Sequence, residues 1–192
     1  MAVAIMERPA RYLSSIMLLL LCACSQRETF VNADAVQVKT SGGITTVKDV
    51  VFTGKLFTLY PNGDTMLIES YRDGKEHGCW KQFYPSHQLK EQRYFEDGKK
   101  QGEYIAFWEN GARKLIYNFD DGEYNGACSE WLSNGLLTKQ MNYSHGYEEG
   151  LQRAWYDNGK IKSNYKMVNG RRFGLLGTKN CTNVSDSVFN SK

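Results

Sequence analysis

Between residues 50 and 174, runs of alternating apolar and polar residues are separated by turn signals, and the pattern repeats every 24 residues. Three columns of large apolar side chains follow this period: Leu59, Phe83, Phe107, Trp131 and Trp155; Tyr60, Tyr84, Trp108, Leu132 and Tyr156; and Tyr71, Phe95, Phe119, Tyr143 and Met167. Each period holds two runs of ~7 residues, the usual length of a strand. The pattern therefore predicts one β-hairpin per unit and leaves no room for a helix.

The glycines repeat with the same period, and 15 of the 18 fall into three columns. The columns are Gly74, Gly98, Gly122, Gly146 and Gly170; Gly54, Gly78, Gly102, Gly126, Gly150 and Gly174; and Gly63, Gly111, Gly135 and Gly159, with His87 in the missing slot. Most follow Asp or Asn, and these dipeptides favour tight turns because both residues tolerate positive φ. We interpret them as structural turn glycines and not as a phosphate-binding loop.

The expected fold is all-β, an elongated single-layer antiparallel meander of stacked 24-residue hairpins. Adjacent strand residues point to opposite faces, so the aromatic pairs are expected to place a ring on each face. These rings have two interpretations, packing within the sheet or an exposed surface for a partner. For the second, Trp108, Trp131 and Trp155 are the candidate binding surface, because Trp is enriched at interaction hot spots.

The unit Asp-Gly-Lys-x-x-Gly-x-Trp/Tyr-x-x-aromatic-aromatic-x-Asn-Gly resembles the MORN repeat, and more closely its bacterial variant found in antitoxin-like proteins. The resemblance covers residues 50–174 and departs from the pattern at Val50, His87 and Cys128. The resemblance implies an elongated, twisted meander that binds a protein without catalysis. It also implies that this binding could serve an antitoxin or immunity role. The first unit is expected to be a degenerate cap, because terminal units of repeat arrays are atypical.

The N-terminus has the features of an export signal. Arg8 and Arg11 precede a short apolar run at residues 16–21, which is too short to span a bilayer as a helix. The segment Leu21-Cys22-Ala23-Cys24 resembles a bacterial lipobox, which implies cleavage before Cys24 and lipidation of its thiol. An ordinary signal peptide with an incidental cysteine is the alternative. We expect a lipid-anchored protein of the bacterial cell envelope, at the outer membrane.

Composition excludes several classes of function. The 24 basic and 21 acidic residues give a net charge of +3 and form no long run of one sign, which disfavours a nucleic-acid partner. No signature of a hydrolase, zinc protease, nucleotide-binding loop or redox pair is present. The three histidines, His77, His87 and His145, share no column, so no metal or cofactor is expected. An exported protein could pair two of Cys79, Cys128 and Cys181, but free buried thiols are expected at Cys79 and Cys128, and Cys181 lies in the tail.

The chain is therefore divided into a signal peptide (1–23), a lipidated N-terminus and polar spacer (24–49), the repeats (50–174) and a tail (175–192). The leading hypothesis is a non-enzymatic, lipid-anchored protein that binds another protein through its sheet surface. The alternative is a structural envelope protein that binds a lipid headgroup or glycan, with the aromatic rings as stacking platforms. An enzyme is the least favoured class, because no catalytic constellation was found.

Overall fold

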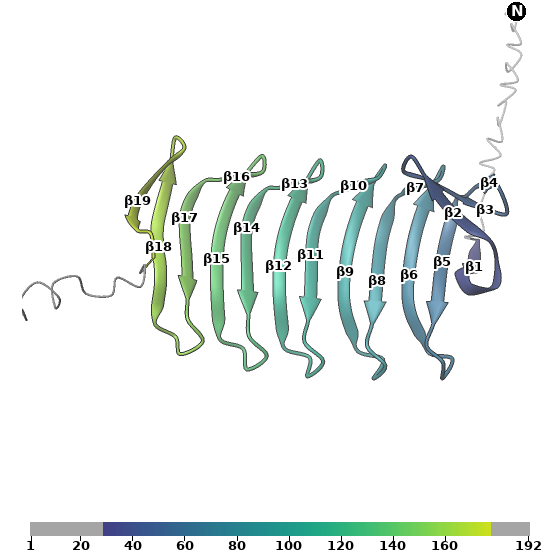
Figure 1. Ribbon diagram of the computed structural model, residues 1–192, viewed down its shortest axis with the longest axis horizontal. Coiled ribbons are helices and arrows are strands. Elements are labelled where there is room, and N and C mark those ends of the chain that lie inside the picture. Colours follow the sequence, from purple (N-terminus) through teal and green to yellow (C-terminus); the bar gives the residue numbers. More distant parts are fainter. Residues whose placement is uncertain (1–28, 178–192) are drawn as a thin grey trace, which may run out of the picture.

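The computed structural model describes residues 29–177, and most of their strands belong to one long, open sheet (Figure 1). The strands stand side by side in chain order as hairpins, with no second layer covering them (Figure 1). The long strands are β5 (Gly54–Leu59), β6 (Thr65–Arg72), β8 (Gly78–Phe83), β9 (Leu89–Glu96), β11 (Gly102–Phe107), β12 (Arg113–Asp120), β14 (Gly126–Trp131), β15 (Leu137–Ser144), β17 (Gly150–Trp155) and β18 (Ile161–Val168). The predicted meander of 24-residue hairpins is confirmed.

Short strands begin each new unit, and they follow the Asp-Gly turns or the equivalent turns at His145-Gly146 and Asn169-Gly170. They are β7 (Lys75–Glu76), β10 (Lys99–Lys100), β13 (Glu123–Tyr124), β16 (Tyr147–Glu148) and, at the end of the described sheet, β19 (Arg171–Leu175). Each pairs with the long strand just before it, so the chain stays hydrogen-bonded as it leaves the turn.

Every lattice glycine has a positive φ, as the turn interpretation requires. At the Asp-Gly turns the preceding residue is also left-handed, for example Asp97 at 48° before Gly98 at 88°. Two consecutive positive φ angles are characteristic of a type I′ turn, whose twist matches that of the strands. His87, in the glycine slot of the second unit, takes the same conformation with φ at 65°.

The Asn-Gly turns are built differently, because only the glycine has a positive φ. The Asn110 side-chain oxygen accepts a hydrogen bond from the Ala112 main-chain N–H at 3.1 Å, and the Gly111 N–H donates to the Trp108 carbonyl at 2.8 Å. The strands beside this turn shift register between Ala106 and Phe107. These turns are therefore longer hairpin loops with a bulge, and the second aromatic of each pair lies in the loop.

The second glycine column serves a packing purpose. Gly78 lies directly opposite Phe95 across β8 and β9, and Gly102 lies opposite Phe119 across β11 and β12. Both rings are buried at 7% exposure. A glycine across from a large ring gives that ring room to lie over the neighbouring backbone.

Successive repeats are hydrogen-bonded to each other at both ends of the strands. At the Asp-Gly end, the Gly98 N–H donates to the Glu76 carbonyl at 2.8 Å, and the Gly122 N–H donates to the Lys100 carbonyl at 2.9 Å. At the Asn-Gly end, the Tyr84 hydroxyl donates to the Phe107 carbonyl at 3.0 Å. The period of 24 thus places each donor against an acceptor of the adjacent repeat.

The segment assigned to a lipidated N-terminus and polar spacer, residues 24–49, folds into defined elements from residue 30 onward. This segment holds β1 (Phe30–Asn32), a 3₁₀ turn η1 (Ala33–Ala35), β2 (Val38–Ser41) and β3 (Ile44–Val47), followed by β4 (Val50–Val51). Strand β1 pairs in parallel with β5, and β2, β3 and β4 form a separate small sheet. The threonines and valines of this segment form strands because the segment packs against the first repeat. The polarity of the segment does not reveal this contact.

The small sheet caps the first repeat. The Thr45 N–H donates to the Gly74 carbonyl at 2.7 Å, and the Gly74 N–H donates to the Phe52 carbonyl at 2.8 Å. Phe52 therefore supplies the acceptor that Glu76 supplies one repeat later. Thr45 and Phe52 are both buried, so the small sheet packs directly on the Gly74 turn that ends the first unit.

Several sequence predictions lie outside the described residues. These are the signal peptide, the lipidation at Cys24, Cys181, and all of the tail after residue 177. Within the described residues, no helix is long and apolar enough to cross a membrane.

Candidate binding face

The strand registers place a defined set of side chains on one face of the sheet, which we call the tyrosine face. Its central row crosses the sheet at one level through Leu56, Glu69, Trp80, Arg93, Tyr104, Tyr117, Cys128, Met141, Gln152 and Tyr165. Six buried side chains of the repeats belong to this face, namely Leu56, Phe95, Ala106, Phe119, Cys128 and Gln152. The tyrosine face therefore holds most of the core.

The expectation that each aromatic pair places one ring on each face stays a prediction. Phe107 follows Ala106 of the tyrosine face within β11, so strand alternation directs the Phe107 ring to the opposite face, whereas Trp108 lies in the loop. Ser70 is the buried side chain of the repeats on the opposite face. That face also carries polar side chains, half-buried aliphatic ones such as Ile105 and Ile116, and the aromatic rings of Phe57 and Tyr94.

Aromatic rings run in contact along the tyrosine face. One series joins Phe52, Tyr71, Trp80 and Phe95, with centroids 6.1, 5.6 and 4.7 Å apart. Further along, Tyr124 contacts Phe119 at 4.7 Å and Tyr143 at 5.1 Å. Such pairs contribute ~0.5–1.5 kcal/mol each beyond the area they bury. Stacking between repeats therefore substitutes for the missing second layer.

Tyrosine hydroxyls on this face donate hydrogen bonds to glutamates. Tyr104 donates to Glu91 at 2.7 Å, Tyr165 donates to Glu148 at 2.9 Å, and Tyr117 donates to Glu130. Burial, followed by the hydrogen bond to Glu91, raises the pKa of Tyr104 to about 12. The phenols therefore remain protonated donors at neutral pH, which suits a role in positioning carboxylates.

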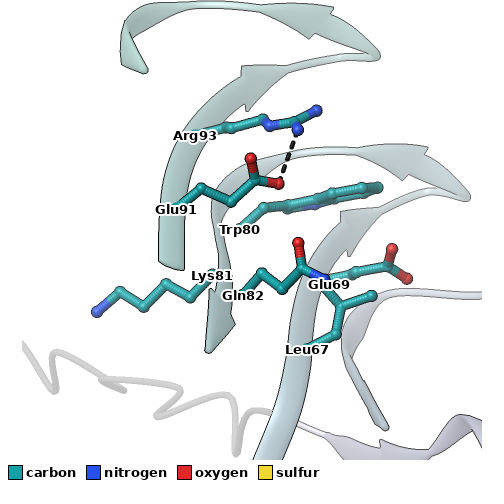
Figure 2. A pocket seen from close by; sticks show the side chains of 7 residues that line it. All are labelled: Leu67, Glu69, Trp80, Lys81, Gln82, Glu91 and Arg93. Atoms are coloured by element: carbon teal, nitrogen blue, oxygen red, sulfur yellow. Dashed lines mark hydrogen bonds and ion pairs between the residues drawn. The ribbon is translucent and has the colours of Figure 1, made fainter. Parts of the chain in front are cut away.

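Two shallow hollows lie on the tyrosine face at equivalent places two repeats apart. The first hollow, about 190 Å³, is lined by Leu67, Glu69, Trp80, Lys81, Gln82, Glu91 and Arg93 of β6, β8 and β9 (Figure 2). The second hollow, about 210 Å³, is lined by Tyr117, Tyr124, Cys128, Glu130, Lys139, Met141 and Tyr143. Five of the residues that line the first hollow each have a counterpart in the second hollow 48 positions, or two repeats, later in the chain. Repetition of the sequence therefore creates both hollows.

Ionic contacts differ between the two hollows. In the first, Arg93 donates to Glu91 at 2.7 Å, and its guanidinium lies over the Tyr104 ring at 4.6 Å. Burial alone would raise the pKa of Glu91, but the hydrogen bonds from Tyr104 and Arg93 outweigh it and lower the pKa. In the second hollow, Lys139 donates to Glu130 at 3.0 Å.

The predicted tryptophan surface is distributed along the Asn-Gly end of the sheet. Trp108 is half-buried, its indole N–H donates to the Trp131 carbonyl at 3.0 Å, and the Lys114 ammonium lies 4.6 Å from its ring. Trp131 and Trp155 are half-buried at the ends of β14 and β17. Trp108 thus links two repeats, and the role of all three in binding stays a prediction.

Among residues 29–177 the two cysteines, Cys79 and Cys128, are not joined by a disulfide. Cys79 is a half-buried free thiol, and Cys128 is a buried one with 1% exposure. Burial raises the pKa of Cys128, so its thiol is poorly suited to act as a nucleophile. Among residues 29–177 no group of His, Cys, Asp or Glu has the arrangement of a metal site.

A third hollow of about 570 Å³ lies at the N-terminal end and is lined by residues including Lys55, Arg72, His77 and Cys79. Arg72 and His77 both contact Asp97, at 3.0 and 3.5 Å. The Arg72 guanidinium and the His77 ring are therefore both directed toward a carboxylate of the next turn.

Sequence reasoning missed the glutamates and Arg93 of the tyrosine face. Glu69 and Arg93 share a column with Tyr117, Met141 and Tyr165, whereas Glu91, Glu130 and Glu148 occupy three other columns, so the period does not reveal a column of charged residues. Strand alternation was the available signal, because the residue two positions before each second-strand aromatic lies on the same face as that ring. Glu69 and Arg93 occupy this position before Tyr71 and Phe95.

Comparison with protein families supports the repeat assignment. Residues 76–97 and 148–169 match the family model described as the MORN repeat variant. The two matches start at equivalent positions three repeats apart, and each runs from the last residue of a short strand through the hairpin after it. No curated protein matches the sequence.

Similarity to solved structures is weak. Two crystal structures of TarM, one of an S. aureus TarM mutant in complex with fondaparinux, alpha-GlcNAc-glycerol and UDP, are 19% identical to this chain with a TM-score of 0.32. The match covers 57% of this chain and 21% of the TarM chain. The GtfA/B complex bound to UDP and GlcNAc is 10% identical, covers 73% and 24%, and has a TM-score of 0.23. This chain therefore spans less than a quarter of those proteins, and scores this low carry no information on function.

Proposed function

We propose that this protein is a non-enzymatic, lipid-anchored repeat protein that binds another protein through the tyrosine face. MORN repeats are in general motifs that bind proteins or membranes, and two segments of this chain match their variant. The observation that carries the proposal is the open tyrosine face, where half-buried aromatic and charged side chains surround two hollows.

The chemistry of this face suits a protein partner. Trp, Tyr and Arg dominate binding hot spots, and all three occur there in positions already ordered by neighbouring side chains. Trp80 donates its indole N–H to the Ser70 carbonyl at 3.0 Å, and Arg93 is held by Glu91. Ordered side chains lose little conformational entropy on binding, which favours affinity.

We further propose that the lipid at Cys24 anchors the protein to the outer membrane of a bacterial envelope, where its partner lies. Several acyl chains on one residue give stable anchoring, since each buried methylene contributes ~0.8 kcal/mol. The proposed partner is an effector that the protein neutralises, in the manner of an antitoxin or immunity protein. A neighbouring gene that encodes a toxin-like effector would support this assignment.

Site-specific photo-crosslinking tests the proposal. A photoreactive phenylalanine analogue replaces Gln82 or Ala154 on the tyrosine face, and Gln92 or Ala127 on the opposite face provides matched controls. Crosslinks to a protein in envelope preparations are expected from the first pair alone. Crosslinks from the opposite face alone would contradict the proposal. Recovery of only glycan or lipid would favour the alternative, a structural envelope protein.

A further inference from the structure

The two hollows of the tyrosine face have the same architecture but different charge balance. In the second hollow, Glu130 has Lys139 as its cation at 3.0 Å and Tyr117 as a hydrogen-bond donor. Elsewhere on the face, Glu91 is paired with Arg93 at 2.7 Å, and Glu148 is paired with Arg172 at 3.1 Å. Three half-buried glutamates therefore each have a cation supplied by this chain.

Glu69 in the first hollow differs from these three. Its hydrogen bond within the described residues comes from the Tyr71 hydroxyl at 3.2 Å, and no cationic side chain of that part of the chain pairs with it. Burial, and the nearby negative charge of Glu76, raise the pKa of Glu69. A carboxylate that is partly desolvated without a cation is unfavourable, and an external cation would relieve this cost.

The surroundings of Glu69 suit the side chain of a lysine or arginine. Figure 2 shows Glu69, Trp80 and Gln82 projecting to the same side, whereas Lys81 points away from them. The Trp80 ring offers a face for a cation, and Leu67 offers an apolar surface for an aliphatic stem. The hollow of about 190 Å³ exceeds the volume of several water molecules at ~30 Å³ each.

We propose that the first hollow receives a lysine or arginine side chain of the partner protein, with its charge on the Glu69 carboxylate and its stem against Leu67 and Trp80. This inference rests on the proposed function, because it assigns the chemistry of the partner at that face. The Arg93–Glu91 pair forms the far wall and is already neutral as a pair. A neutral sugar could stack on Trp80 but would leave the Glu69 charge uncompensated, so the charge balance favours a cation.

Titration with small probes tests the hollow without a partner. The full chain is titrated with Nα-acetyl-lysine methylamide while NMR follows the Trp80 indole N–H, and the Trp108 indole serves as an internal reference. Nα-acetyl-norleucine methylamide provides the same stem without the charge. The lysine derivative is expected to shift the Trp80 signal and to bind about tenfold more tightly than the norleucine derivative.

Two variants separate the first hollow from the second. Glu69→Gln is expected to weaken binding of the lysine derivative about tenfold, whereas Glu130→Gln is expected to leave the Trp80 response unchanged. A second measurement needs no variant: binding to the wild-type protein is expected to weaken as the pH falls and Glu69 becomes protonated.

Three results would overturn the inference. They are equal binding of the norleucine derivative, wild-type affinity in the Glu69→Gln variant, or a Trp80 response to N-acetylglucosamine but not to the lysine derivative. The crosslinking experiment reports separately on whether a protein occupies the face. Failure of the probe titration is thus distinguishable from failure of the proposed function.

Discussion

The indole N–H of Trp108 donates a hydrogen bond to the main-chain carbonyl of Trp131, 3.0 Å away in the next repeat. Tyr60 and Tyr84, at the same place in earlier units, donate to Phe83 and Phe107 in the same way, at 2.7 and 3.0 Å. Leu132 is the next member of this column and has no side-chain donor. A packing residue at a turn thus also links neighbouring units of a sheet that has no second layer.

Replacement of Trp108 with phenylalanine is expected to destabilise the protein by about 1 kcal/mol or more, because the Trp131 carbonyl loses its side-chain donor. Urea unfolding followed by circular dichroism measures the change. Tyr147→Phe is the control, since Tyr147 is 80% exposed. An equal loss in both variants would contradict the linking role of Trp108.

Gly102→Val is expected to cost ~1–3 kcal/mol, because a β-branched residue is strained at a φ of +72°. No atom lies within 4 Å of the added Cβ, so the cost comes from the backbone and not from a clash. Gly102→Asn should cost less, since asparagine tolerates this region. The melting temperatures of the two variants test the order, and an unchanged value for Gly102→Val would refute the turn assignment.

Glu69→Gln is expected to stabilise the protein near neutral pH. The pKa of Glu69 is raised on folding, so its ionisation opposes folding once the pH exceeds the unfolded value of about 4.5. The difference from wild type should grow as the pH rises through the folded pKa and vanish below the unfolded one. Melting temperatures recorded across this pH range provide the measurement.

Glu91→Gln should have the opposite sign, because hydrogen bonds from Tyr104 and Arg93 lower the pKa of Glu91. Its ionised form therefore stabilises the fold above the unfolded pKa, and that stability is lost as the pH falls through the folded pKa. The variant should be less stable than wild type at neutral pH. The same direction of change in both variants would argue against the assigned environments.

The thiol of Cys128 is expected to resist modification until the protein unfolds, because it is 1% exposed and burial raises its pKa. Cys79 is half-buried and should react faster in the native protein. The rates can be followed with a chromogenic disulfide reagent in variants that keep one of the two cysteines. Rapid native reaction of Cys128 would show that the tyrosine face opens locally.

Cys24→Ala is expected to abolish lipid labelling and to release the protein from the membrane fraction, because the proposed anchor requires the thiol of Cys24. Cys181→Ala, at the other end of the chain, is the matched control and should leave fractionation unchanged. Membrane association of the Cys24→Ala variant without lipid would favour the ordinary signal peptide and another means of attachment.

Much of the fold followed from the sequence because each repeat encodes its own hairpin. Asp97-Gly98 and Asn110-Gly111 specify turns through residues that are themselves part of the turn, and the 24-residue period then aligns successive units. The small sheet at residues 38–51 was missed for the opposite reason. It folds against the Gly74 turn, a contact with a separate part of the chain that no local pattern records.

The candidate site was less accessible to sequence reasoning. Tryptophan is a common binding residue, and the sequence predicts Trp108 as part of a binding surface for that reason. In the structure, however, the Trp108 indole N–H donates a hydrogen bond that links two repeats. Glu69 and Glu130 look alike as residues, and only the register of neighbouring strands shows that Lys139 reaches one of them.

The sequence by itself determined the hairpin unit, its period and the positions of the turns, because these depend on local φ preferences and strand alternation. Only the tertiary structure decided which face carries the core, how the first repeat is capped and which glutamate lacks a cation. Those properties depend on side chains brought together across strands, where burial and Coulomb interactions act over a few ångströms regardless of distance along the chain.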